Sequence, residues 1–215
     1  MLSVLCRLLR CRRGLAALEF ALVIPILLLC LAGVTDLSLA IITERRLAIA
    51  AEDVAIIAST MAVQSATLGQ LSGEQAWQAT TAPFALFPQW LTQQGGFSIT
   101  LSGVGFTASG TSYSATTSWS VANPLGQTRF RPCGTLGPTA NGSTVTLSTL
   151  PASSFGPTSL LVADISTVFT PVFTWIFLGD VPMSQSAYFS PRVQNNVTLN
   201  AGGPAATELC PAAQS

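Results

Sequence analysis

The sequence predicts an α+β fold in which a long N-terminal helix packs on an antiparallel β-sheet domain. Three observations support this prediction. Residues 15–35 form an apolar run whose only charge is Glu19, and helical spacing of apolar residues continues from there to about Thr67. From residue 96 onward, apolar residues alternate with Gly, Ser and Thr. The first two features predict one long helix that begins in a membrane, and the third predicts the sheet.

The overall composition excludes two broad classes of protein. The 215 residues are 49% hydrophobic and 8% charged, with a mean hydropathy of +0.53, which is too apolar for a disordered chain. Nine basic residues balance nine acidic ones. A nucleic-acid-binding protein would carry a basic face, so we expect no nucleic-acid partner.

Histidine and lysine are both absent from the chain. The commonest general base, the commonest nitrogen ligand for metals and the Schiff-base amine are therefore missing. Serines are plentiful, but a serine nucleophile needs a general base, and the candidates are Asp164 or Asp180, each acting alone. We expect a protein that is not an enzyme and that has no metal site and no cofactor.

Residues 15–35 are predicted to cross a membrane. Twenty-one helical residues span about 31 Å, close to the thickness of the hydrocarbon core of a bilayer. Four arginines precede this run with no acid among them, so the positive-inside rule places the N-terminus in the cytoplasm and exports everything after Asp36. We expect a transmembrane helix over 15–42 and an exported α+β domain over 43–215. The four arginines are Arg7, Arg10, Arg12 and Arg13.

Two other interpretations of this segment fit poorly. A cleaved secretory signal has a shorter apolar core followed closely by a small-x-small site, whereas Ala48-Ile49-Ala50 lies far beyond the run. A lipoprotein signal needs a small residue before its cysteine, but Leu29 precedes Cys30.

The start of the apolar run carries an unusual charge. A carboxylate near the centre of a membrane costs roughly 2.5–3.5 kcal/mol and less near an interface, so Glu19 needs either a partner or a place among the headgroups. Arg12, Arg13 and Gly14 precede it, and Phe20 follows it. This junction resembles the prepilin-peptidase site of the Tad (tight adherence, Flp-type) pilus system. The chain is too long for the major pilin and is similar to the TadE-like minor pseudopilins.

The resemblance implies how the chain is processed. Cleavage would follow Gly14, because glycine presents no Cβ to the peptidase cleft, and Leu15 would become the new N-terminus. Residues 1–14 would be a cytoplasmic prepilin leader in which Arg12 and Arg13 supply the charges that the peptidase recognises.

The resemblance also implies partners and a location. Glu19 and Phe20 would stand fifth and sixth in the mature chain and would act in assembly, where a buried Glu can pair with the new amino terminus of a neighbouring subunit. The implied partners are a prepilin peptidase, other pseudopilins, the inner-membrane platform proteins of the pilus system and the lipid bilayer. The implied location is the bacterial inner membrane with the C-terminal domain in the periplasm, or the pilus itself.

Helical spacing continues past Asp36, and we expect the sheet to pack on one apolar stripe of this helix. A second stripe is expected to be core or to contact other pseudopilins, and Pro25 is expected to kink the membrane span. The first stripe consists of Leu47, Val54, Ile57, Met61 and Leu68, and the second of Ile49, Ile56 and Val63.

A short helix is predicted to begin at Ser72, where Ser72 and Gln75 can form a capping box, and to end near Pro83 and Pro88. Strands are predicted over 96–103, 111–121, 143–147, 160–169, 181–189 and 193–199.

The five cysteines separate by compartment. Cys6 and Cys11 lie in the leader and Cys30 lies in the span, so only Cys133 and Cys210 reach an oxidising compartment. One disulfide is therefore expected, between Cys133 and Cys210, and two free thiols are the alternative. Closing a loop of this size stabilises the fold by roughly 4 kcal/mol in the chain-entropy model.

Two functions of different classes follow. The leading hypothesis is a non-catalytic assembly protein, a TadE-like minor pseudopilin. The alternative is a membrane-anchored binding or adhesin subunit whose β-rich domain recognises a ligand. An exposed aromatic patch at Trp77, Trp90 or Trp119 would favour the alternative, although we expect each of these tryptophans to be buried.

Overall fold

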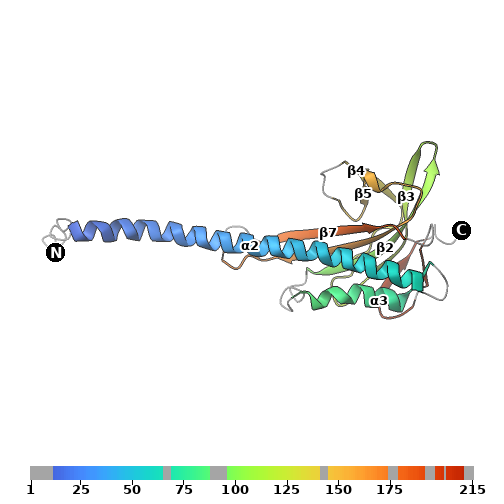
Figure 1. Ribbon diagram of the computed structural model, residues 1–215, viewed down its shortest axis with the longest axis horizontal. Helices are drawn as coiled ribbons and strands as arrows, with labels where there is room; N and C mark the ends of the chain where they lie inside the picture. Colours follow the sequence, from blue (N-terminus) through green and yellow to red (C-terminus); the bar gives the residue numbers. More distant parts are fainter. Residues whose placement is uncertain are drawn as a thin grey trace. The chain divides into compact units, whose positions relative to one another are not determined.

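The structure is a computed structural model that describes residues 12–64, 69–87, 96–140, 145–173, 179–191, 197–200 and 202–210 (Figure 1). The chain divides into two compact units. The first comprises Met1–Ile42 with Thr170–Asp180, and the second comprises Thr43–Phe169 with Val181–Ser215. The described parts of the two units are treated separately below.

Helix α2 runs from Arg12 to Gln64 and confirms the predicted long N-terminal helix. Its most apolar part belongs to the first unit. Among the described residues, one helical segment, Leu18–Val63, is long and apolar enough to cross a membrane, and no residue of its most apolar stretch is buried. Pro25 lies inside the helix, and the kink expected there stays a prediction. Thr67, the predicted end of the helix, lies outside the described residues.

In the second unit, the C-terminal part of α2 packs on the sheet through a seam of small residues. Leu47 and Val54 of the predicted stripe are buried, and Ile57 and Met61 pack against the same core. The sequence pattern did not reveal that alanines fill most of this seam. Alanine has a short side chain and the highest helix propensity, so it lets the helix lie close to the sheet at no cost in helix formation. The buried alanines are Ala50, Ala51, Ala55, Ala58 and Ala62.

The predicted capping box forms at the start of α3 (Gly73–Thr81). The Oγ of Ser72 accepts a hydrogen bond from the backbone N–H of Gln75 at 3.2 Å, and the Gln75 Oε1 accepts one from the backbone N–H of Ser72 at 2.9 Å. A 3₁₀ turn, η1 (Ala82–Ala85), follows directly and contains Pro83 near its start. Ala76 and Ala79 of α3 join the core that also holds α2.

The second unit contains a seven-stranded sheet with the order β5-β4-β3-β2-β6-β7, and β9 pairs with β3 beside this path. All of its pairings are antiparallel except β4 with β5. A separate parallel pair joins β1 and β8. The strands are β1 (Gln70–Ser72), β2 (Ser98–Ser109), β3 (Ser112–Ala122), β4 (Thr135–Thr139), β5 (Thr149–Pro151), β6 (Leu160–Phe169), β7 (Val181–Phe189), β8 (Thr198–Asn200) and β9 (Ala206–Leu209), with a 3₁₀ turn, η2 (Ala152–Ser154), after β5.

Strand β2 continues six residues beyond Gly103, where the prediction ended it. The pairing of β2 with β3 shifts between Gly103 and Val104, which marks a β-bulge. The indole of Trp119, the partner of Gly103 on β3, occupies the space that any Cβ at residue 103 would need. This glycine therefore makes room for a buried aromatic side chain and does not end the strand.

The strand predicted over 143–147 is wrong in its described part. Val145 and Thr146 are irregular, and a turn follows at 147–148. The Thr149 hydroxyl accepts a hydrogen bond from the Thr146 N–H at 2.9 Å, and the Thr149 N–H donates to the Thr146 carbonyl at 3.1 Å. Hydroxyl side chains compete with a strand ladder in this way. Residues 193–196 of the last predicted strand lie outside the described residues.

Two apolar clusters cover the two faces of the sheet. The larger one lies between the sheet and the helices and includes Leu47, Trp119 and Leu161, and the Trp119 Nε1 donates a hydrogen bond to the Val197 carbonyl at 2.7 Å. The smaller cluster, on the opposite face, includes Leu160 and Val162. Successive residues of a strand point to opposite faces, so β6 turns Asp164 toward the side of the smaller cluster.

Candidate functional site

The predicted cleavage junction lies in the first turns of α2. The described part of the helix includes Gly14 and Leu15, so the peptide bond between them belongs to helical backbone. Glycine is a weak helix former, so it lowers the stability of the helix at this bond.

Glu19 and Phe20 face outward from α2. Phe20 is 67% exposed, and Glu19 is exposed as well. Among the side chains that the structure describes, none forms a hydrogen bond or an ion pair with Glu19. Within a single chain the carboxylate thus lies on the helix surface, where a neighbouring chain can reach it.

The far end of the predicted span carries a buried acid. Asp36 is 3% exposed. Its Oδ1 accepts hydrogen bonds from the backbone N–H groups of Val172 at 2.9 Å and Phe173 at 3.3 Å, and its Oδ2 accepts from Phe173 at 3.0 Å. These three residues all belong to the first unit. The carboxylate therefore holds two consecutive amides of the segment that connects β6 to β7.

In the second unit, Arg131 and Asp164 form a buried ion pair. The Arg131 side chain is fully buried and donates from Nε to Oδ2 at 3.2 Å and from Nη2 to Oδ1 at 2.8 Å. Its Nη1 donates to the Thr149 carbonyl at 3.1 Å, and its backbone N–H donates to the Ser120 Oγ at 3.0 Å. This pair links the segment after β3 to β5 and β6.

Ser186 on β7 completes the surroundings of Asp164. The Ser186 hydroxyl donates to the Asp164 Oδ1 at 2.6 Å. Burial raises the pKa of the Asp164 carboxyl, and Arg131 and Ser186 act in the opposite direction. A carboxylate held by a fork of guanidinium donors and a hydroxyl is a structural anchor, since the donors already occupy its lone pairs.

A cavity of about 240 Å³ lies beside this anchor on the same face of the sheet. Serine and threonine side chains contribute to its wall, and two of their hydroxyls, from Ser98 and Ser166, lie 2.7 Å apart. Within the described residues, no group of three or more His, Cys, Asp or Glu side chains is placed to hold a metal ion. The other wall residues include Thr100, Arg129, Ser184 and Ser186.

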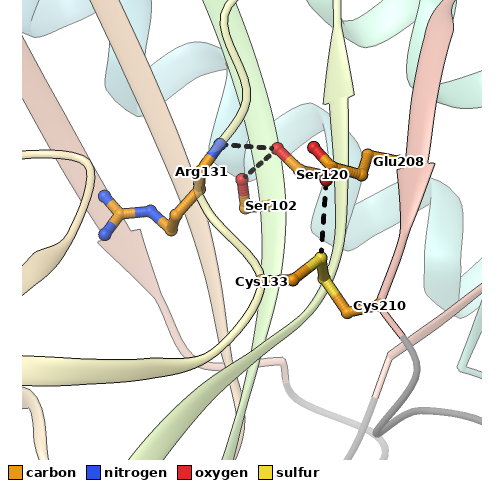
Figure 2. The surroundings of a disulfide bond; sticks show 6 residues. All are labelled: Ser102, Ser120, Arg131, Cys133, Glu208 and Cys210. Atoms are coloured by element: carbon orange, nitrogen blue, oxygen red, sulfur yellow. Dashed lines mark hydrogen bonds between the residues drawn. A yellow bond between two sulfur atoms is a disulfide. The ribbon is translucent and has the colours of Figure 1, made fainter.

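The predicted disulfide is present, with Cys133 and Cys210 bonded and their Cα atoms 5.4 Å apart (Figure 2). It connects two short strands that lie along one side of β3. Strands β9 and β4 both run antiparallel to β3. Along β3, the last residue of β9 lies opposite Trp119, and the first residue of β4 lies three residues further, opposite Thr116. The bond therefore joins the end of one strand to the start of the next. Cys133 precedes β4, not the strand expected over 143–147.

Figure 2 places Glu208 beside the disulfide, with its Oε1 3.7 Å from the Cys133 Sγ. A disulfide sulfur carries no proton, so this distance describes a contact. The Ser120 hydroxyl links the backbone N–H of Arg131 to the Ser102 hydroxyl, which lies 3.0 Å from it. The Arg131 side chain extends away from the sulfur atoms (Figure 2).

The sequence analysis missed the Arg131–Asp164 pair but contained a signal for it. Between Gln75 and Ala163 the sequence has only two charged residues, Arg129 and Arg131. An isolated charge in a long apolar and hydroxyl-rich stretch indicates a buried partner, and Asp164 is the first acid that follows.

Comparison with known families identifies a match at the N-terminal end of the chain. Residues 14–55 match the family TadE, described as TadE-like protein. The matched region begins at Gly14 and covers the predicted membrane span and the helical residues that follow it, which confirms the resemblance inferred from the junction. No curated protein and no solved structure matches the chain.

Proposed function

Because residues 14–55 are TadE-like, we propose that this chain is a minor pseudopilin that acts without catalysis in the assembly of a Tad-type pilus. The observation that carries the proposal is the TadE-like match, which begins at the glycine of the junction and continues through Glu19 and Phe20. A prepilin peptidase cuts after Gly14, and the mature chain begins at Leu15.

The surface of α2 supports a role in assembly. Phe20 and the outward-facing Glu19 leave the start of the span open to a neighbouring helix. In the exported half, Ile49 is 55% exposed and Ile56 is exposed on the same side, so the second predicted stripe is not used by the core. Other pseudopilins and the inner-membrane platform proteins are the proposed partners of these surfaces.

The orientation follows from the charges. The arginines before the span hold the N-terminus in the cytoplasm, where the peptidase meets Arg12 and Arg13, and the exported domain lies in the periplasm. The Cys133–Cys210 disulfide supports this orientation, because disulfides persist in oxidising compartments.

The alternative, a ligand-binding adhesin subunit, would be favoured by an exposed tryptophan patch, and the described residues show none at Trp77 or Trp119. Trp119 is buried beneath the sheet, and Trp77 packs partly against the same core. Trp90 lies outside the described residues. The two described tryptophans that were candidates for a binding patch thus contribute to the fold.

The proposal is tested by expressing the full chain in membranes with and without a cognate prepilin peptidase and determining its N-terminus. We expect Leu15 as the first residue only when the peptidase is present. Cleavage removes four arginines, so the side-chain charge falls from 9 − 9 = 0 to 5 − 9 = −4. An intact Met1 in the presence of the peptidase, or a cut after Ala50, would contradict the proposal.

A matched pair of glycine substitutions separates recognition from helix disruption. Gly14→Leu should leave the precursor uncut, because the side chain obstructs the peptidase cleft. Gly33→Leu places the same side chain on the same helix at a position where a Cβ meets no other atom, and it should be cut normally. Equal cutting of both variants would show that Gly14 does not define the site.

A further inference from the structure

The segment that connects β6 to β7 has the composition of a membrane-contacting loop. Between Thr170 and Asp180 the sequence reads Pro-Val-Phe-Thr-Trp-Ile-Phe-Leu-Gly and contains no charge. In its described part, Val172 and Phe173 are 56% and 58% exposed. Exposed apolar side chains on neighbouring residues normally mark an interaction surface.

The structure places this surface against the predicted span. Phe173 and one side of α2 line an apolar groove of about 540 Å³ within the first unit. The helix residues in its wall all belong to the 15–35 run that is predicted to lie in the bilayer. They are Pro25, Leu28, Leu29, Leu31, Ala32 and Thr35.

The depth of Phe173 follows from its contact with Asp36. Asp36 lies about 31 Å along the helix axis from Leu15, a distance that matches the hydrocarbon thickness and puts Asp36 at the outer edge of the core. Because the Asp36 carboxylate accepts the Phe173 N–H at 3.0 Å, Phe173 lies at the same edge.

The same contact removes the main obstacle to placing an irregular segment in lipid. Backbone N–H groups that face hydrocarbon have no water to bond, so irregular backbone enters a membrane only where protein satisfies it. Asp36 accepts from both Val172 and Phe173. In return, these two amides and the covering loop let an acid lie buried at the edge of the span.

From this geometry we infer that Val172 and Phe173, in the described part of the segment after β6, form a second membrane contact in the outer interface of the bilayer, with Asp36 as the residue that positions them. The occupant of the groove is lipid acyl chain, because the groove wall is the predicted membrane span itself. Aromatic side chains favour this interface. The inference depends on the span and not on the proposed role in pilus assembly.

The test measures the depth of residue 173 in a bilayer. The full chain with Phe173→Cys, and with Cys6, Cys11 and Cys30 replaced by serine or alanine, is labelled with an environment-sensitive fluorophore and reconstituted into phosphatidylcholine vesicles. The remaining cysteines are protected in the disulfide. A label at Tyr113 is the comparison. Tyr113 lies at the β2–β3 turn, whereas the segment that carries Phe173 follows β6. The end of β6 pairs with Ser98 at the other end of β2.

We expect the label at residue 173 to lose most of its emission to nitroxide lipids that carry the spin label near the headgroup, and little to aqueous iodide. The label at 113 should give the reverse. Quenching of residue 173 by iodide as strong as at residue 113 would overturn the inference. Protection of residue 173 from both quenchers would also overturn it, because a protein surface would then cover the loop.

A second pair of variants tests Asp36 in the same labelled chain. Asp36→Ala removes the acceptor of two loop amides and should shift the label at 173 from lipid quenching toward iodide quenching. Ser38→Ala removes a hydroxyl whose partner among the described residues is the Val34 carbonyl of the same helix, and it should leave the label in lipid. Unchanged quenching in Asp36→Ala would overturn the role given to the carboxylate.

Discussion

Arg131 and Asp164, 33 residues apart in the sequence, form a bidentate ion pair in which the arginine side chain is wholly buried. Arg131 belongs to the segment after β3, and Asp164 lies on β6, two strands away in the sheet. The pair connects the segment after β3, which crosses one face of the sheet, to β6, at a place where hydroxyl side chains give little apolar packing. We interpret the ion pair as the feature that fixes the path of this crossing segment over the sheet.

The first prediction concerns the stability of this pair. Asp164→Ala leaves a buried guanidinium without a counter-ion and should lower the free energy of unfolding by about 3–5 kcal/mol. Urea unfolding of the full chain in detergent, followed by tryptophan fluorescence, measures the loss. The double variant Arg131→Met with Asp164→Leu removes both charges and should recover most of it.

Arg129→Ala is the control for this prediction. The Arg129 side chain is exposed and, among the described residues, donates to the Gln127 Oε1, whereas the Thr100 hydroxyl bonds to the Arg129 backbone carbonyl, which alanine keeps. The loss of the side chain should therefore change the free energy of unfolding by less than about 0.5 kcal/mol. If Asp164→Ala were as mild as Arg129→Ala, the buried pair would not hold the crossing segment.

The second prediction concerns the ionisation of Tyr188. Its hydroxyl oxygen is buried, and burial raises the pKa of the Tyr188 phenol above its usual value near 10, although the neighbouring Ser186 hydroxyl acts in the opposite direction. Folding therefore favours the protonated phenol. The contribution of the protonated Tyr188 phenol to the free energy of unfolding is fully present below about pH 10. This contribution is lost as the pH rises through the raised pKa.

A phenolate absorbance titration of the Tyr113→Phe variant isolates Tyr188, since the chain has two tyrosines. The folded variant should titrate at higher pH than the same chain in denaturant, and its resistance to urea should fall over that alkaline range. Coincident titrations of the folded and denatured chains would contradict the burial of the hydroxyl.

The third prediction concerns the disulfide. Cys210→Ser opens a bond that spans 77 residues and should lower the free energy of unfolding by roughly 4 kcal/mol. The exposed free thiol of Cys30 provides the control, because Cys30→Ser should leave the urea midpoint unchanged. Peptide mapping after alkylation without reduction checks the pairing. Alkylation of both Cys133 and Cys210 would contradict the bond and the exported orientation.

The sequence predicted the elements whose signals are local. The capping box at Ser72 and Gln75 requires only three residues of spacing. Both bounds predicted for β6 and β7 match those in the structure. The cysteine pairing followed from compartments, because only two of the cysteines are predicted to be exported. Each of these signals can be read without knowing the tertiary structure.

The elements that were missed depend on partners distant in the chain. Strands β4 and β9 are short, and their pairing with β3 defines them, since their own sequences show little alternation. Gly103 resembled the end of a strand because the need for space came from Trp119 on the neighbouring strand. The Asp36 contact with Phe173 joins residues 137 positions apart, and no sequence pattern encodes that distance.

The last prediction concerns Glu19, which we expect to act in assembly and not in membrane insertion or processing. After cleavage Glu19 is the fifth residue, about one helical turn from the new amino terminus, where a bond within the same helix is awkward. A neighbouring subunit, shifted along the bundle axis, can bring its own terminal amine to the exposed carboxylate. In a medium of low dielectric constant such a pair is strong enough to fix the register between helices.

Glu19→Ala should therefore insert at least as well as the natural chain, because an apolar residue replaces a costly one, and it should still be cut after Gly14. It should fail to co-purify with partner pseudopilins and fail to support piliation, whereas Glu19→Asp, with a shorter reach, should be intermediate. Glu52→Ala removes an exposed acid from the exported half of the same helix and should assemble normally. Normal piliation by Glu19→Ala would mean that the carboxylate only snorkels to the headgroups at the start of the helix.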